Sequence, residues 1–206
     1  MSKFTLYALE GWGSAIVEAA LATAGLDYVI ETVDPRGEGR DRLLRLNPLG
    51  QLPTLVLPDG RVMTESAAII LHISELRPEA GLAPSADDPS RPEFLRWLIF
   101  LIAAVYPTFA VGDLPERWIA GKKAQADLTR GAIEQRCRTW RMVEVAAKGP
   151  WFLGERFSAI DLYIGAMTHW RPTRSWFEAN CPKLHAIALK ADAHPGAAKV
   201  WKRNFA

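Results

Sequence analysis

Cysteine is scarce in this sequence, and the two cysteines present form no pattern. Cys137 and Cys181 lie far apart in the 206-residue chain and make no Cys-x-x-Cys pair. Zinc sites and disulfide frameworks need cysteines at characteristic spacings, so the sequence predicts neither. The four histidines also lack metal-ligand spacing. We therefore expect no metal site, and unpaired thiols favour a reducing, cytoplasmic compartment.

Long apolar runs and a strong charge imbalance are also missing. No stretch approaches the about 18 uninterrupted apolar residues of a membrane-spanning helix, and residues 1–7 read as a strand rather than as a signal peptide. The net charge is only +2, which is too small to indicate nucleic acid or an acidic membrane surface. The sequence predicts a protein whose partners include neither a membrane nor a nucleic acid.

Large aromatic residues, by contrast, are plentiful in the second half of the chain. Six of the eight tryptophans lie between residues 97 and 176. Such residues either line an apolar pocket or anchor the core, and the sequence leaves both interpretations open.

The most informative segment is residues 47–66. Pro53 stands before the apolar run at residues 54–57, where proline can precede a strand without joining its ladder. Pro58-Asp59-Gly60 is a turn sequence. Thr64-Glu65-Ser66 then begins an apolar run, and Thr64 or Ser66 is a candidate helix cap. The segment predicts a β-hairpin that leads into a helix, and a helix N-terminus favours anions.

The first 78 residues are predicted to alternate strands and helices in the order β-α-β-α-β-β-α. Strands are expected at residues 3–7 and 27–33, and helices at residues 14–24, 40–46 and 65–76, around the hairpin. Gly25 is well placed to end the first of these helices.

The rest of the chain is predicted to be helical after a proline-rich linker at residues 79–91. Helices are expected at residues 93–105, 122–147, 158–169 and 182–193. A mixed half followed by a helical half predicts an α/β domain at residues 1–78 and an all-α domain at residues 92–206. Ser158-Ala-Ile-Asp161 resembles a capping box, with Phe157 and Leu162 as its hydrophobic staple.

These pieces, in this order and spacing, resemble those of glutathione transferases along the whole chain. The resemblance rests on the strand and helix order, Leu52-Pro53 before the third strand, Glu65-Ser66 at the last helix of the first domain, and the segment Phe152-Leu-Gly-Glu-Arg-Phe-Ser-Ala-Ile-Asp161. It implies a thioredoxin-like N-terminal domain followed by an all-helical domain.

The same resemblance implies where glutathione binds. Pro53 would follow a cis peptide bond, so that the backbone of Leu52 faces the cysteinyl unit. Ser66 would receive the γ-glutamyl carboxylate at the helix N-terminus and Glu65 the ammonium group. Gln51, beside the same turn, is a further candidate contact or a solvated loop residue.

The loop after the first strand determines how the thiol is activated. It contains no cysteine, so the resemblance disfavours a protein thiol as the reacting group. Ser14 is the first candidate donor to the thiolate, because it lies at a helix start, and Tyr7 is the second. The backbone N–H groups of Trp12 and Gly13 are a third source of hydrogen bonds.

The site of the electrophile is expected between the two domains. Its candidate residues are the large aromatics Trp12, Tyr106, Phe109, Trp118 and Trp170.

The resemblance thus implies an enzyme that binds glutathione as co-substrate and promotes attack of its thiolate on a hydrophobic electrophile. It also implies a homodimer, in which the first domain of one subunit faces the helical domain of the other, and a role in detoxification. Three alternatives remain open: a glutathione-dependent disulfide reductase, a glutathione-dependent peroxidase, and a non-catalytic binding or interaction module.

Overall fold

The computed structural model describes residues 3–37 and 39–206. Its N-terminal part has the predicted order of strands and helices. The elements are β1 (Phe4–Ala8), α1 (Ser14–Thr23), β2 (Tyr28–Thr32), α2 (Arg40–Leu46), β3 (Thr54–Val56), β4 (Val62–Met63) and α3 (Ser66–Leu76).

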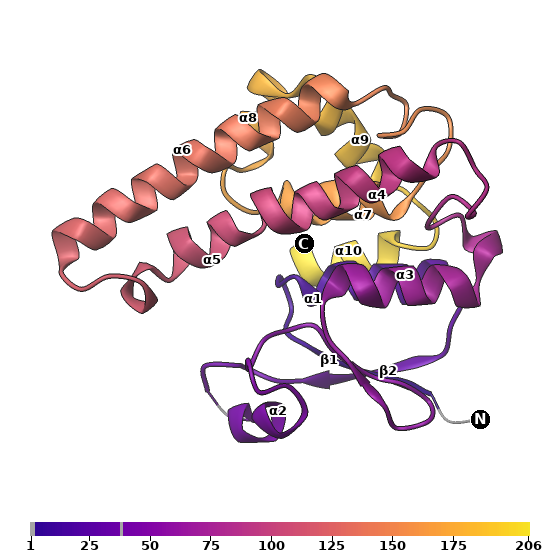
Figure 1. Ribbon diagram of the computed structural model, residues 1–206, viewed down its shortest axis with the longest axis horizontal. Helices are drawn as coiled ribbons and strands as arrows, with labels where there is room; N and C mark the ends of the chain where they lie inside the picture. The colour runs from indigo at the N-terminus through magenta and orange to yellow at the C-terminus, as the bar shows by residue number, and fades with distance from the viewer. Residues whose placement is uncertain (1–2, 38) are drawn as a thin grey trace.

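These four strands form one mixed sheet in the order β2-β1-β3-β4. β1 is parallel to β2 and antiparallel to β3, and β3 and β4 form the predicted hairpin. Gly60 in its turn has a φ of 88°, which glycine adopts without a steric penalty. In Figure 1, α2 lies on one face of the sheet, while α1 and α3 lie between the other face and the remaining helices.

Alternation along β1 assigns its side chains to the two faces of the sheet. Phe4, Leu6 and Ala8 are buried, whereas Thr5 and Tyr7 are half-buried. Helix α1 is buried along most of its length, because it is covered by the sheet on one side and contacts α7 and α10 of the helical part on the other. Gly25 follows it with a φ of 61°, which ends the helix as predicted.

The C-terminal part is entirely helical. Its α-helices are α4 (Arg91–Phe100), α5 (Pro107–Asp113), α6 (Lys122–Ala146), α7 (Ala159–Met167), α8 (Arg174–Asn180), α9 (Pro182–Asp192) and α10 (Ala198–Phe205). The thioredoxin-like α/β domain followed by a helical domain is the predicted fold class. Residues 81–90, all of which the structure describes, contain no helix or strand, in the region where the sequence places the linker.

A π-helical turn, η2 (Leu101–Val105), joins α4 to α5. The Tyr106 N–H donates to the Leu101 carbonyl at 2.8 Å, five residues back, and Pro107, which has no N–H, starts α5. Arg91–Asp113 is the stretch that passes a test of length and apolar composition for a membrane span within the described residues. Its inward-facing apolar side chains lie in the hydrophobic core.

The predicted capping box is present at the start of α7. Ser158 and Asp161 exchange hydrogen bonds, and the Asp161 carboxylate also accepts from the Phe152 N–H at 2.8 Å. Burial raises the pKa of Asp161 to about 6, although these hydrogen bonds act in the opposite direction.

Three α-helices of the described residues were not predicted, and each omission has a local reason. Proline and the π-turn conceal the continuity of α5 with α4, although proline is well accommodated in the first turn of a helix. Helices α8 and α10 contain only seven and eight residues, too few to display a helical period clearly.

Candidate functional site

The turn before β3 is organised by one buried side chain. Asn47, 3% exposed, donates from Nδ2 to the Gln51 carbonyl at 3.0 Å and to Thr54 Oγ1 at 3.2 Å. The peptide bond between Leu52 and Pro53 is cis, as the resemblance implies. Asn47 therefore holds this turn from inside and leaves the Gln51 side chain exposed.

The strand register brings Leu52 next to the loop between β1 and α1. Tyr7 on β1 is paired with Thr54 on β3, and the two strands are antiparallel. The residues that follow Tyr7 therefore run alongside those that precede Thr54. Leu52 and the loop that begins at Leu9 form one edge of the domain.

Glu65 and Ser66 lie at the N-terminus of α3. Glu65 has a φ of 64°, an unfavourable value for a residue with a side chain and one that is often found at ligand sites. The expectation that Thr64 or Ser66 caps the helix is wrong, because no side chain makes a cap hydrogen bond there. Instead, Ser66 Oγ accepts a hydrogen bond of 2.7 Å from the Tyr163 hydroxyl.

Tyr163 belongs to α7 and is fully buried. Burial is the main cause that raises the pKa of its phenol, and the nearby Tyr106 and Glu65 raise it further. The phenol therefore stays protonated and donates to Ser66. One oxygen lone pair of Ser66 is taken in this way, and its own proton is available to an acceptor.

The two residues predicted to activate a thiol have specific surroundings. Ser14 is 1% exposed, and its hydroxyl donates to the Leu9 carbonyl and accepts from the Leu9 N–H, both at 3.2 Å. Tyr7 lies on the α2 face, where the Arg42 guanidinium is 5.4 Å from the centre of its ring. A donor role for Ser14 requires its hydrogen bonds to Leu9 to break. The proposed roles of Ser14 and Tyr7 as donors to a thiolate both stay predictions.

The helical domain holds the β1–α1 loop at Gly11. The Gly11 N–H donates to Asn204 Oδ1 at 3.2 Å, and the Gly11 carbonyl accepts from Trp170 Nε1 at 2.8 Å. Asn204 is in α10, and Trp170 follows α7. Both polar groups of this glycine are thus fixed by the second domain.

Three of the five predicted pocket aromatics form a cluster beside this loop. The ring centroids of Tyr106 and Phe109 are 6.1 Å apart, those of Tyr106 and Trp170 5.8 Å, and those of Phe109 and Trp170 5.2 Å, all edge-to-face. The buried guanidinium of Arg136 lies 3.7 Å from the Phe109 ring centroid and packs on the face of that ring.

The other two predicted pocket residues lie elsewhere. Trp118 follows a short 3-10 turn after α5, is 61% exposed and makes no ring contact with the cluster within the described residues. Trp12 packs under Arg36, whose guanidinium is 4.9 Å from its ring centroid, and so faces the loop that follows β2.

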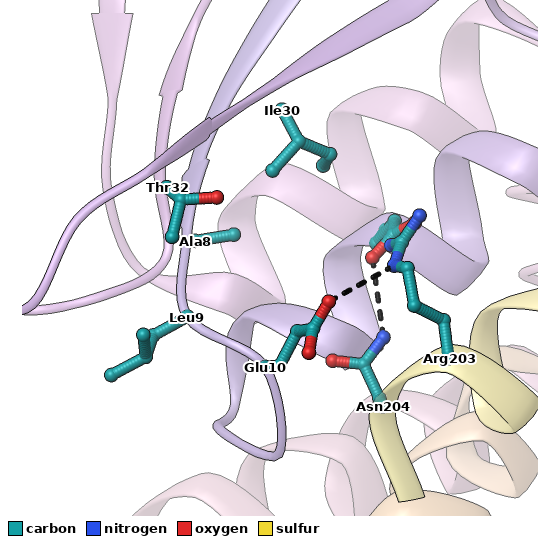
Figure 2. Close-up of a pocket in the computed structure, with 8 residues that line it drawn as sticks. Ala8, Leu9, Glu10, Ile30, Thr32, Arg203 and Asn204 are labelled. Atoms are coloured by element: carbon teal, nitrogen blue, oxygen red, sulfur yellow. Dashed lines mark hydrogen bonds and ion pairs between the residues drawn. The ribbon is translucent and has the colours of Figure 1, made fainter. Parts of the chain in front are cut away.

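A small pocket lies where the loop meets α10. It has a volume of about 220 Å³ and is bordered by β1, β2, the loop and α10. Figure 2 shows Arg203 and Asn204 extending from α10 toward the loop at Glu10. Glu18 on α1, 2% exposed, pairs here with Arg203 and accepts from the Tyr28 hydroxyl at 3.1 Å. None of the predicted glutathione-binding residues lines this pocket.

In the part of the chain that the structure describes, no group of three or more His, Cys, Asp or Glu side chains comes together. The arrangement has two parts. One is a cradle of polar groups at Leu52, Glu65, Ser66 and the start of α1, and the other is an aromatic wall of Tyr106, Phe109 and Trp170.

The fold and this arrangement define a two-domain protein of the thioredoxin-like class, and comparison with known proteins gives the family. Residues 14–76 match the family model of the glutathione S-transferase N-terminal domain. The chain is 38% identical over 204 residues to the uncharacterized GST-like protein YncG of Escherichia coli K12, covering 97% of both proteins. The chain belongs to the glutathione transferase superfamily.

Two further relatives connect this family to glutathione. The glutathione S-transferase GstA of Escherichia coli O157:H7 is 27% identical over 172 residues, with 80% of this chain and 81% of that protein covered. The solved structure of a glutathione transferase homolog from Sulfitobacter with bound glutathione superposes with a TM-score of 0.87 at 25% identity and covers both chains completely.

Proposed function

We propose that this protein binds glutathione and promotes attack of its thiolate on a hydrophobic electrophile. The observation that carries the proposal is the Ser66 site. There, a hydroxyl with a free proton stands at the N-terminus of a helix of 11 residues. The free N–H groups of such a terminus favour a carboxylate. The structure of a relative with bound glutathione supports the choice of ligand.

Each part of the peptide has a proposed partner. Ser66 receives the γ-glutamyl carboxylate and the exposed Glu65 its ammonium group. The Leu52 backbone, presented by the cis bond to Pro53, pairs with the cysteinyl unit, and Gln51 contacts the peptide from the same turn. The sulfur then lies toward the loop and the start of α1, because Leu52 runs alongside that loop.

The start of α1 favours the thiolate form of the sulfur. Helix N-termini lower the pKa of nearby thiols. The N–H groups of Gly13 and Ser14 have no hydrogen-bond acceptor among the described residues, so they are available to a ligand. The hydroxyls of Ser14 and Tyr7 remain the predicted side-chain donors.

The cluster of Tyr106, Phe109 and Trp170 is the proposed wall of the electrophile site. Trp12 belongs to the loop itself and faces Arg36, and the exposed Trp118 is left out of the proposed site. The protein is further proposed to act in the cytoplasm as a homodimer, in detoxification.

Calorimetric titration of the whole protein with glutathione tests the binding site. Ser66→Ala removes the hydroxyl proposed to donate to a carboxylate, and such hydrogen bonds contribute roughly 1.5–3 kcal/mol, so the dissociation constant should rise about tenfold or more. Ser74→Ala is the matched control, because Ser74 lies in the same helix and bonds only to the Leu71 carbonyl. Unchanged affinity in Ser66→Ala would contradict the assignment.

An activity panel separates the possible reactions. Turnover of an aryl halide would support thiolate transfer, turnover of a hydroperoxide a peroxidase, and turnover of hydroxyethyl disulfide a disulfide reductase. A protein that binds glutathione and turns over none of these would be a non-catalytic binding module.

A further inference from the structure

Gly13 and Tyr106 come into unusually close contact. A Cβ atom added to Gly13 would lie 1.7 Å from the Tyr106 hydroxyl oxygen and 3.0 Å from Cζ. Gly13 is the N-cap of α1 and has a φ of −60°, so its backbone suits any residue and the constraint is spatial. The hydroxyl of Tyr106 occupies the place that a side chain at position 13 would take.

The ring of Tyr106 is fixed in this position. Trp170 and Phe109 contact it edge-to-face, and Trp170 is itself bonded to the loop at the Gly11 carbonyl. The backbone of Tyr106 is set by the π-helical turn, whose closing bond it donates to Leu101. π-Helical turns are frequent at functional sites.

The Tyr106 hydroxyl has no hydrogen-bond partner in the described part of the chain. The hydroxyls of two other tyrosines are satisfied, Tyr28 by Glu18 and Tyr163 by Ser66. Tyr106 is half-buried, and its hydroxyl is directed at the start of α1. The phenol is therefore a donor that a ligand bound beside Gly13 can reach.

This donor lies between the two ends of the proposed cradle. On one side is Gly13, at the N-terminus of α1. On the other is Tyr163, which bonds to Ser66 and lies close enough to Tyr106 for the two phenols to interact electrostatically. Tyr106 therefore neighbours both Gly13 and the tyrosine that bonds to Ser66, so a ligand held at Ser66 and directed toward α1 would lie near this hydroxyl.

We propose that Tyr106 donates the hydrogen bond that stabilises the thiolate of bound glutathione, a role that rests on the proposed function. The thiol proton leaves to water, and the phenol keeps its own proton. Burial raises the pKa of Tyr106, so the phenol remains a donor at neutral pH. The hydroxyl of Ser14 is engaged with Leu9, and Tyr7 lies under Arg42, which leaves Tyr106 as the phenol at the start of α1.

The thiol pKa of bound glutathione tests this role. Tyr106→Phe removes the hydroxyl and keeps the ring. Thiolate absorbance of the complex, titrated against pH, should show a rise of the thiol pKa by about one to two pH units. Tyr28→Phe removes a hydroxyl that bonds to Glu18 and to no residue of the proposed site, and should leave that pKa unchanged. An unchanged thiol pKa in Tyr106→Phe would overturn the proposal. A rise of the thiol pKa seen only in Ser14→Ala or only in Tyr7→Phe would overturn it as well.

A second pair of variants tests the geometry without glutathione. Gly13→Ala places a methyl group on the Tyr106 hydroxyl and should lower the midpoint of urea unfolding, and combining it with Tyr106→Phe should restore part of the loss. Gly131→Ala is the matched control, since that position in α6 has open space around it. No loss in Gly13→Ala would contradict the contact.

The outcomes separate the two proposals. A wild-type protein that does not bind glutathione overturns both. Binding that survives in Tyr106→Phe with the thiol pKa unshifted overturns the role of Tyr106 alone, while Ser66 and the cradle stand.

Discussion

At the scale of single residues, the bond between Tyr163 and Ser66 determines what the serine can do. The phenol occupies one lone pair of Ser66 Oγ at 2.7 Å, so the serine proton points elsewhere. Beside it, Glu65 accepts an unfavourable backbone conformation. This conformation is costly for a simple helix start and reasonable for one that binds a ligand.

Tyr163→Phe should weaken glutathione binding with little change of fold. The ring stays in the core, and the loss of one net hydrogen bond, about 0.5–1.5 kcal/mol, corresponds to a rise of the dissociation constant by about two- to tenfold. Titration calorimetry measures it.

Tyr28→Phe serves as the control, because its hydroxyl contacts Glu18 and not the site. Equal affinity of Tyr163→Phe and the wild type would show that Ser66 does not depend on this contact.

Through its family resemblance, the sequence predicts the residues whose proposed roles are local. Pro53, Glu65 and Ser66 lie within one turn-strand-turn-helix segment whose spacing is readable. The contact of Tyr163 with Ser66 joins two residues that are 97 positions apart, and the contact of Asn204 with Gly11 joins two that are 193 positions apart. No periodicity or motif marks such partners, because only the tertiary fold brings them together.

At the scale of elements, the last helix holds the first loop. Helix α10 lies beside α1 (Figure 1) and contributes Asn204, which bonds to Gly11, Glu18 and the Val200 carbonyl. The loop contains two glycines, Gly11 and Gly13, and would be mobile without such contacts. Helix α10 thereby fixes the loop that leads into α1, where the sulfur is proposed to lie.

Asn204→Ala should lower kcat more than it raises the KM for glutathione, because it frees the loop at the sulfur and leaves the Ser66 end intact. It should also cost about 1–3 kcal/mol of stability, measured by urea unfolding.

Lys202→Ala, an exposed change on the same helix, is the control and should alter neither quantity. A normal kcat in Asn204→Ala would show that α10 does not order the loop.

Elements follow from sequence where their end signals are strong. The capping box at Ser158 and the Pro-Asp-Gly turn are short motifs that specify a local structure on their own. The structure contains both. Helix α5 escapes prediction because Pro107 reads as a break, whereas the π-helical turn lets the chain continue through it.

At the scale of the whole molecule, each domain completes the other. The first domain supplies the proposed cradle, and the second supplies Tyr163, which bonds to Ser66, and Trp170 and Asn204, which bond to Gly11. Apolar side chains also remain exposed around the first domain, among them Leu49, Val62 and Leu76. They are candidate contacts of the proposed homodimer.

Leu49→Arg tests that dimer. Leu49 is 69% exposed on the turn before β3, and a charge there would be costly inside an interface. Light scattering should give a dimer for the wild type and half that mass for Leu49→Arg. Val145→Arg, at an 82% exposed site on α6, should remain dimeric. A monomeric wild type would refute the proposal.

The central claim is that glutathione lies between Ser66 and the start of α1. A crystal structure of the protein soaked with glutathione tests it most directly. We expect the γ-glutamyl carboxylate at Ser66, the cysteinyl backbone at Leu52, and the sulfur within hydrogen-bond distance of the Tyr106 hydroxyl. Glutathione bound elsewhere, or a cradle that stays empty at saturating glutathione, would contradict the claim.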